Sequence, residues 1–405
     1  MSNLNYPFEP VAHEDWVHQI QKELRDQADR IHYKDYLEGL ELNITAEQPI
    51  HHIPFPIGSA GTNCVHFERI QEEKESNRRM LMALMQGANA LFLAIEKEQI
   101  DWNTVFHQIE LAYIRTEILV QNEAQWLEIK AQLTKEQLKH LVFINDLISN
   151  HPIPGCQAYF NGFEIHEIGA TAIEELSILL SSYHRYLMTG NQMEALFSLG
   201  IGNQYFVQLA KIRSFHYLVH KLNGIHGIEK ANYRLHAHIG WMNKSLKDPY
   251  TNLLRQTTEA MSAYGGVVNG LIIHPWDEYS KEGKEDFTLR MAINIYNLLS
   301  EEAHFNWVQD PMKGSRIVEG LTNQIIEKTW SRIQQLTDMD ESSMISSAIS
   351  QIEKTRQQRI AKWQQAEEKL IGINSFLNTD HGKANTWGVL PSYLGKEYLI
   401  VEKNG

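Results

Sequence analysis

The sequence predicts an α/β protein built around a closed (β/α)8 barrel, the TIM barrel. Short apolar segments alternate with amphipathic helical patterns, and about eight such units fit between residues 65 and 376. Strands that alternate with helices form right-handed βαβ units around a parallel sheet. A chain of 405 residues is long enough to bury such a core. This number of units favours a closed barrel, and a doubly wound open sheet is the alternative.

The repeating units follow one another along the chain. The first begins with a helical pattern over residues 67–85, which precedes a buried strand that ends at residue 95. Further strands are expected at residues 113–119, 141–144, 158–162, 196–202, 233–238, 270–274 and 307–309. Helices are expected at residues 123–133, 172–188, 249–264, 287–303 and 321–336, and another helix follows the strand at 196–202 and ends near residue 222.

The two ends of the chain do not follow this pattern. Residues 1–64 hold a charged helix at 14–30 and an extended segment with prolines, so we expect an arm that lies outside the barrel. The barrel is expected to span residues 65–376, including a polar helix at 343–370 that is either solvated or packed on a partner. Residues 377–405 are expected to form a tail, without a second globular domain.

Composition narrows the class of function. The formal net charge of -13 argues against non-specific binding to nucleic acid or to anionic membranes. No segment has a signal-peptide pattern, and no apolar run is long enough to cross a bilayer. The two cysteines, Cys64 and Cys156, form no CxxC pair, which is typical of a reduced compartment. We therefore expect a cytoplasmic protein with neither nucleic acid nor membrane as a partner.

One loop gathers residues suited to acid, base or metal chemistry. The stretch G-F-E-I-H-E-I-G-A at 162–170 offers Glu164, His166 and Glu167 directly after a strand, where barrel enzymes carry their chemistry. Generic motifs give no support: the dinucleotide fingerprint lacks its third glycine, and neither a P-loop nor a nucleophile elbow occurs. His236 and His238 share one face of a strand, but no third ligand converges on them, so no metal site is expected.

Longer stretches carry a more specific signal. Residues 234–266 begin R-L-H-A-H-I-G-W-M-N-K-S-L-K-D-P-Y, and residues 310–322 read D-P-M-K-G-S-R-I-V-E-G-L-T. Residues 205–213, Y-F-V-Q-L-A-K-I-R, and the loop at 162–170 belong to the same collinear set. Together these stretches resemble the methylmalonyl-CoA mutase family over roughly residues 15–376.

This resemblance implies a barrel threaded by an acyl-CoA substrate, with adenosylcobalamin held across its mouth. The implied reaction interconverts succinyl-CoA and methylmalonyl-CoA by a radical rearrangement. Catalytic chains of the family carry a cobalamin domain with a D-x-H-x-x-G motif, whose histidine binds cobalt. That motif does not occur in these 405 residues. We therefore expect no cobalamin-binding domain, no bound cofactor and no metal ligand in this chain.

The resemblance also points to lost catalytic groups. A Tyr-His pair of the family aligns with Phe163 and Glu164, and its histidine hydrogen-bonds the migrating thioester carbonyl. An ionised glutamate there would repel the charge that develops on that carbonyl, whereas a buried, protonated one would donate to it. Glu194 aligns with an arginine that faces CoA, and residues 144–155 lack the family's CoA segment. We expect no catalytic residue in this chain.

Three residues remain as candidates for vestigial substrate binding. His236 and Arg234 match a substrate-side histidine and its neighbour in the family, and His238 replaces a glutamine. A single retained histidine among several lost groups is more typical of packing than of function.

These features predict a non-catalytic small subunit of a heterodimeric, adenosylcobalamin-dependent mutase of this family, active in propionate metabolism. Its partner would be the catalytic large subunit, which would bind the cofactor. The arm at residues 15–53 would form part of the interface, or would simply cover its own barrel. One alternative is a stand-alone acyl-CoA-binding or regulatory barrel protein. Another is a catalyst that receives a cobalamin domain from a separate chain, which Phe163 and Glu164 argue against.

Overall fold

The computed structural model describes most of the chain. The described residues are 11–25, 32–43, 53, 61–148, 151–191, 193–229, 233–245, 248–278 and 285–377. The predicted tail, and most of the proline-containing segment of the arm, lie outside these residues.

Eight parallel strands form a closed barrel, which confirms the predicted fold class and excludes the open sheet. They are β3 (Asn63–Ile70), β4 (Ala90–Ile95), β5 (Arg115–Leu119), β6 (Leu141–Asp146), β7 (Gln157–Asn161), β8 (Ala195–Gly200), β9 (Tyr233–Ile239) and β10 (Gly270–Ile273). Each strand pairs with the next in the sequence, and β10 closes on β3 through the pairs Gly270–Asn63 and Leu271–Cys64. The barrel encloses a cluster of buried apolar side chains that comes from the strands alone.

Two predicted elements are wrong. Residues 67–70 belong to β3 (Asn63–Ile70) and not to the predicted helix at 67–85, because apolar and polar residues alternate in V-H-F-E at the centre of the strand. Helix α2 (Glu73–Met85) begins only after Glu72, whose carboxylate accepts hydrogen bonds from the amides of Lys74 and Glu75. The strand expected at 307–309 does not form either, because residues 305–307 make one turn of 3-10 helix.

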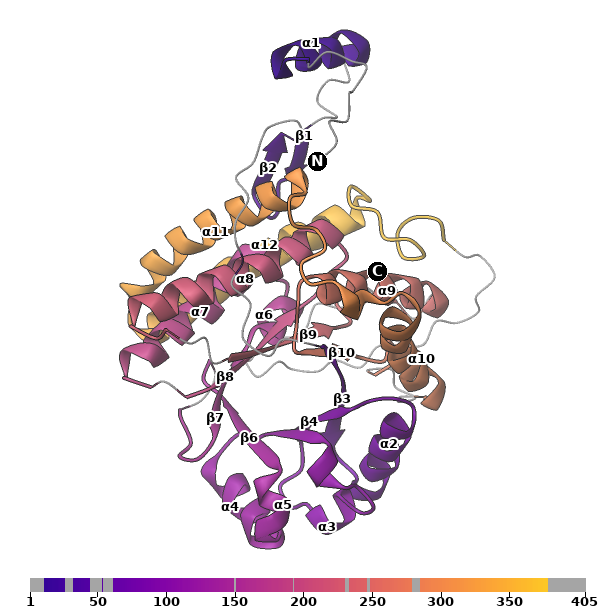
Figure 1. The fold of residues 1–405 in the computed structure, drawn as a ribbon, viewed down its shortest axis with the longest axis vertical. Coiled ribbons are helices and arrows are strands. Elements are labelled where there is room, and N and C mark those ends of the chain that lie inside the picture. Colours follow the sequence, from indigo (N-terminus) through magenta and orange to yellow (C-terminus); the bar gives the residue numbers. More distant parts are fainter. Residues whose placement is uncertain are drawn as a thin grey trace, which may run out of the picture.

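Helices cover the outside of the barrel (Figure 1). They are α2, α3 (Trp102–Val105), α4 (Glu123–Gln132), α5 (Lys135–Lys139), α7 (Ala172–Met188), α8 (Tyr205–Ile225), α9 (Pro249–Gly265) and α10 (Asp286–Asn297), whereas the short helix α6 (Gly162–Glu167) follows β7 and is buried. Short turns of helix, η2 (Leu111–Tyr113), η3 (Leu298–Glu302) and η4 (Phe305–Trp307), precede β5 or follow α10. Helix α7 starts at the predicted residue, because Thr171 and Glu174 form a capping box.

A second layer lies over α7 and α8 (Figure 1). Helix α11 (Arg316–Thr337) packs on both of these helices, and α12 (Glu341–Gln364) packs on α7. The interpretation of α12 as a solvated or partner-bound helix is therefore only partly right. One of its faces, which includes Met344, Ile352 and Trp363, is buried within its own chain.

The arm contains a hairpin that the sequence analysis did not predict. Strands β1 (His32–Asp35) and β2 (Leu40–Asn43) pair in antiparallel fashion. Leu40 and Leu42 are buried in the main apolar core, and β2 packs on α11. The hairpin therefore covers its own barrel.

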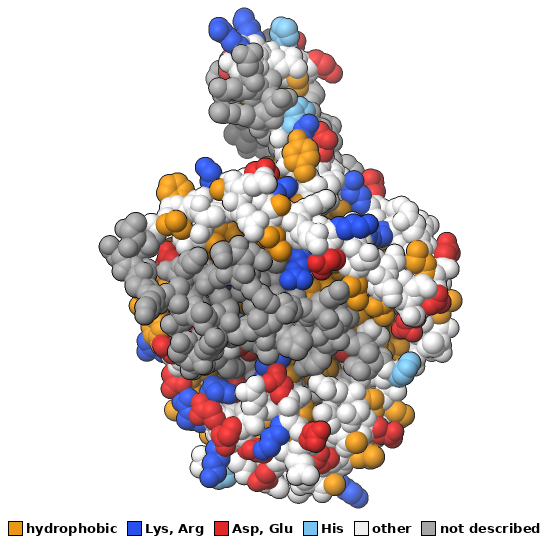
Figure 2. Space-filling model, turned by 180° about the vertical axis from the view of Figure 1, so that it is seen from behind, with side chains coloured by type: hydrophobic (Ala, Val, Ile, Leu, Met, Phe, Trp, Pro, Cys, Tyr) orange, Lys and Arg blue, Asp and Glu red, His pale blue; other side chains and the backbone are white. Residues whose placement is uncertain are grey.

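Helix α1 (His13–Leu24) differs from the hairpin, because none of its described side chains is buried. Figure 1 and Figure 2 both show it projecting beyond the body of the barrel. Its apolar residues include Trp16 and Ile20, which lie one turn apart and share a face. No helix among the described residues is long and apolar enough to cross a membrane.

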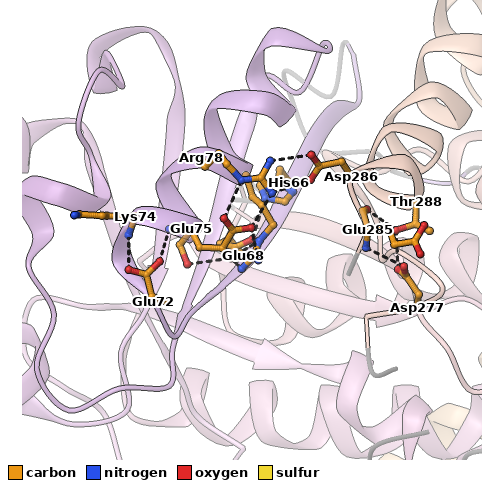
Figure 3. A network of polar contacts seen from close by, with 12 residues as sticks. His66, Glu68, Glu72, Lys74, Glu75, Arg78, Asp277, Glu285, Asp286 and Thr288 are labelled. Atoms are coloured by element: carbon orange, nitrogen blue, oxygen red, sulfur yellow. Dashed lines mark hydrogen bonds and ion pairs between the residues drawn. The ribbon is translucent and has the colours of Figure 1, made fainter. Parts of the chain in front are cut away.

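A polar network joins the first and last units of the barrel (Figure 3). Glu68 of β3 is buried and forms an ion pair with Arg79 of α2. The neighbouring Arg78 binds both Glu75 and Asp286, with distances of 2.7 and 2.8 Å. Because Asp286 begins α10, this arginine links the helices that flank the seam between β3 and β10.

Candidate functional site at the barrel mouth

The loop singled out in the sequence forms helix α6 at the carboxyl end of β7. Asn161 caps this helix by accepting a hydrogen bond from the amide of Glu164 at 3.3 Å. Residue 162 must be glycine, because a Cβ there would lie 2.5 Å from the carbonyl oxygen of Ser198. All six residues of α6 are buried, so their side chains face other parts of the barrel and not solvent.

Phe163 packs in a group of rings. Its ring stacks on His238 with a centroid distance of 4.5 Å and on His274 with 5.0 Å, and it meets Trp241 edge-on at 5.3 Å. Gly240 makes this packing possible, because a Cβ at that position would lie 2.8 Å from the Phe163 ring. Phe163, which stands where the family has a hydroxyl-bearing ring, is therefore surrounded by other rings.

Glu164 is only 3% exposed, beside the interior of the barrel. Burial is the main cause that raises the pKa of Tyr159 well above its ordinary value, and the nearby carboxylates of Asp146 and Glu164 add to it. The Tyr159 hydroxyl donates a hydrogen bond to Ser198 at 2.8 Å. Burial is one of the two conditions for the donating role that the sequence left open, and protonation is the other.

The three candidate binding residues lie along the inner face of β9. His236 Nε2 is 3.5 Å from Glu117 Oε2 of β5. Burial lowers the pKa of His236 to about 4, so its ring is neutral near pH 7. His238 Nδ1 lies 3.1 Å from His274 Nε2, and burial likewise lowers the pKa of His238 well below its ordinary value. His274 Nδ1 is in turn 2.8 Å from Glu278 Oε2.

Arg234 belongs to a group of charges at the opposite, amino-terminal end of the strands. Burial and the neighbouring Arg115 lower the pKa of Arg234, whereas Glu117 and Glu194 raise it. Arg115 Nε binds Glu117 at 2.7 Å, and Glu194 accepts a hydrogen bond from Gln157 at 3.1 Å. Arg234 and His236 thus both lie near Glu117, whereas His238 pairs with His274, so the three candidate residues divide between two polar groups.

Aromatic rings meet across the centre of the barrel. Phe92 of β4 lies 5.6 Å from both Phe67 of β3 and Tyr159 of β7, measured between ring centroids. Its ring is also 6.1 Å from those of His236 and His238 on β9. Contacts at these distances are those of a packed aromatic core. The centre of the barrel is therefore filled by side chains from strands on different sides.

His166 and Glu167, the other two polar residues of α6, contact buried groups of the protein. Burial raises the pKa of Glu167 to about 8, and its carboxylate accepts a hydrogen bond from the amide of Trp241 at 3.4 Å. His166 Nδ1 lies 3.7 Å from Glu175, which forms a buried ion pair with Lys211 at 2.6 Å. Neither residue offers an accessible acid, base or metal ligand.

Sequence reasoning missed several members of this cluster. His274 and Glu278 escaped notice because nothing in their local sequence indicates a contact with β9. Phe92 and Glu117 stand at alternate positions of their strands, a signal that identifies a strand face but not which face turns inward. Phe67 was missed because it was assigned to the predicted helix at 67–85, which is wrong at this residue. Within the described part of the chain, no group of three or more His, Cys, Asp or Glu side chains is arranged to hold a metal ion.

Comparison with known proteins identifies the family. The sequence profile described as methylmalonyl-CoA mutase matches residues 147–390, which is more than half of the chain. The chain belongs to the methylmalonyl-CoA mutase family. The resemblance inferred from sequence motifs is therefore confirmed, and the match includes α6 and β9.

Relatives within the mutase family are similar over a limited part of their length. The chain is 34% identical over 192 residues to the methylmalonyl-CoA mutase small subunit of Porphyromonas gingivalis, covering 45% of this chain and 30% of that protein. It is 29% identical over 233 residues to the methylmalonyl-CoA mutase large subunit of Propionibacterium freudenreichii, covering 53% and 32%. The matches thus span about a third of these relatives.

Among solved structures, Plasmodium falciparum HPPK-DHPS aligns with a TM-score of 0.35 and 12% identity, covering 71% of this chain and 53% of that one. The assignment of the barrel rests on the strand pairing and not on this alignment.

Proposed function

We propose that this chain is the non-catalytic small subunit of a heterodimeric methylmalonyl-CoA mutase. In this proposal it acts in the cytoplasm as the structural partner of a catalytic large subunit. The complex would interconvert succinyl-CoA and methylmalonyl-CoA. Similarity to a protein named as a small subunit supports this role.

The filled centre of the barrel is the observation that carries the proposal. An acyl-CoA chain threaded along the axis needs the space that Phe92, Tyr159 and His236 occupy. Phe163 is held in a stack with His238, and neither ring has a hydroxyl group to offer a thioester carbonyl. Substrate binding on the axis would require several buried rings to move at once, which is costly in a close-packed core.

Adenosylcobalamin is the cofactor that the family implies, and the described residues do not fit its cobalt. His236, His238 and His274 are each 1% exposed and lie in ring contacts, so their nitrogens are not accessible from outside the barrel. The family's cobalt-binding motif, D-x-H-x-x-G, is also absent from these 405 residues. The proposal therefore assigns the cofactor to the partner chain.

Part of the arm is available to a partner. The hairpin residues Leu40 and Leu42 are buried against the chain's own core, so this part of the predicted interface covers its own barrel. Helix α1, by contrast, has no buried side chain among those that the structure describes. An exposed amphipathic helix gains stability when a second surface covers its apolar face.

Two measurements on purified protein test this proposal. Size-exclusion chromatography of the chain mixed with the large mutase subunit of the same organism is expected to give a stable 1:1 complex. Calorimetric titration of the isolated chain with succinyl-CoA is expected to give no heat of binding below millimolar concentration. Sub-millimolar binding by the isolated chain, without complex formation, would instead favour a stand-alone acyl-CoA-binding protein.

A further inference from the structure

A groove separates the two helices of the outer layer. Helices α11 and α12 are consecutive, are joined by residues 338–340, and both pack on α7. Between them lies a groove of about 720 Å³, whose floor includes the buried side chains of Ile173 and Leu336. Its walls are exposed side chains of the two helices, so the groove is open to solvent along its length.

Three cations line this groove. Lys328 and Arg332 lie one turn apart on α11, and Lys354 lies on α12. Neither lysine has an ion pair or hydrogen bond within the described part of the chain, and Arg332 reaches Glu174 only at 3.9 Å. Glu327 is the one acidic side chain among the described lining residues. In a chain with a net charge of -13, this gathering of positive charge, with two unpaired lysines, attracts an anionic group.

The dimensions of the groove favour a helix as the occupant. Residues 327–336 of α11 border it, and at 1.5 Å per residue they span about 14 Å, or roughly two and a half helical turns. On the wall formed by α12, Ser347 and Ser350 have short side chains, which let another backbone approach closely. An apolar floor between polar walls matches the way in which an amphipathic helix binds in a groove.

We propose that the groove between α11 and α12 binds an amphipathic helix of the catalytic partner, with its apolar stripe on Ile173 and Leu336 and acidic side chains facing Lys328, Arg332 and Lys354. This inference rests on the proposed function, because that function supplies the partner. Complementary charges at such a site speed association and fix the direction of the bound helix.

Charge reversal tests the groove. The double variant Lys328→Glu/Lys354→Glu is expected to weaken binding of the large subunit by about tenfold in calorimetry at 0.15 M salt. The control, Lys135→Glu/Lys139→Glu, makes the same charge change on α5, where both lysines are also exposed and Lys139 pairs with Glu136 at 2.7 Å, and is expected to weaken it less than threefold. All these side chains are exposed, so melting temperatures should stay close to that of the unmodified chain.

The outcomes of this experiment separate the two proposals. Equal affinity of the groove variant and the control would overturn the groove as a docking site, while leaving the subunit function intact. Failure of the unmodified chain to bind the large subunit would overturn the proposed function itself.

A photo-crosslinking residue placed at Ser350 identifies the occupant directly. The expected product joins Ser350 to a helix of the large subunit that carries Asp or Glu beside an apolar stripe. The same residue placed at Lys135 is expected to give no such product. A crosslink to residues 1–31 of this chain would overturn the proposal in favour of its own arm. Binding of pyrophosphate that the charge-reversal variant abolishes, with assembly unaffected, would overturn it in favour of a small-anion site.

Discussion

The centre of the barrel and the groove on its outer layer use polar residues in opposite ways. In the centre, His236 and His238 are buried, neutral and enclosed by aromatic rings. In the groove, Lys328 and Lys354 are exposed and have no partner within the described residues. A barrel enzyme normally places its reactive groups at the mouth of the barrel. Here packed side chains occupy the mouth and centre, where His236 Nδ1 and His238 Nε2 are buried without a hydrogen-bond partner among the described residues, and the exposed unpaired lysines lie outside.

This difference is what the proposed scaffold role requires. A core filled by packed aromatic rings contributes to folding, while a surface with unpaired charges remains available for binding. The predictions below challenge this contrast, beginning with the largest expected effect.

Removal of a central ring should be very costly if the barrel is filled. Phe92→Ala deletes the ring that contacts rings on β3, β7 and β9. We expect the free energy of unfolding, measured by urea denaturation, to fall by about 3–5 kcal/mol. The control Phe206→Ala removes a ring that is 43% exposed and should cost less than about 1 kcal/mol. A similarly small loss for Phe92→Ala would mean that the centre is not packed.

Acid should destabilise the barrel through its buried histidines. The folded pKa of His236 is about 4, below the value of about 6.5 in an unfolded chain, so the unfolded state binds the proton first. This histidine therefore lowers stability as pH falls from about 6.5 to about 4. Over this pH range the free energy of unfolding should fall in both proteins. The fall should be about 3 kcal/mol smaller in the His236→Leu variant than in the unmodified chain.

Buried carboxyl groups act in the opposite direction, so the comparison must be made between variants. Burial raises the pKa of Glu38 to about 7 and that of Glu167 to about 8, so their contribution to stability is present at low pH and is lost as pH rises through these values. Identical pH profiles of the His236→Leu variant and the unmodified chain would contradict the neutral, buried state of His236.

Crowding the barrel mouth tests the packing of Phe163 and Glu167. In Gly240→Ala the new methyl group would lie 2.1 Å from a Glu167 oxygen and 2.8 Å from the Phe163 ring. We expect a loss of about 1–3 kcal/mol in the free energy of unfolding. Gly224→Ala is the matched control, because its methyl group meets nothing within 4 Å in helix α8 and should stabilise by roughly 0.5–1 kcal/mol. If the barrel mouth were open, the two substitutions would change the free energy of unfolding by similar amounts.

Much of the fold follows from local sequence signals. Helix α7 was predicted at its observed bounds from its long apolar pattern, and the structure shows that a capping box begins it. The boundary between β3 and α2 was missed, because the alternating strand pattern runs almost directly into the helix. The β1–β2 hairpin was missed for a different reason. It depends on tertiary contacts, such as the hydrogen bond from the amide of Glu41 to Gln324, 283 positions later in the chain.

The sequence identified residues of the candidate site but did not predict which of them contact one another. Motifs singled out Phe163, Glu164 and the residues of β9, and the structure gives their surroundings. The stack of Phe163 on His238 and His274 depends on the register of β9 and β10, which sequence patterns do not specify. The role of these positions in a subunit without its own chemistry remains a prediction.

The most direct test of the central claim is adenosylcobalamin-dependent turnover of succinyl-CoA. It is measured for the purified chain, for the large mutase subunit of the same organism, and for their mixture. We predict no turnover by this chain alone and full activity in the mixture, carried by the large subunit. Turnover by this chain alone would contradict the account, because it would require the ring-filled barrel to open and Glu164 to act on the substrate.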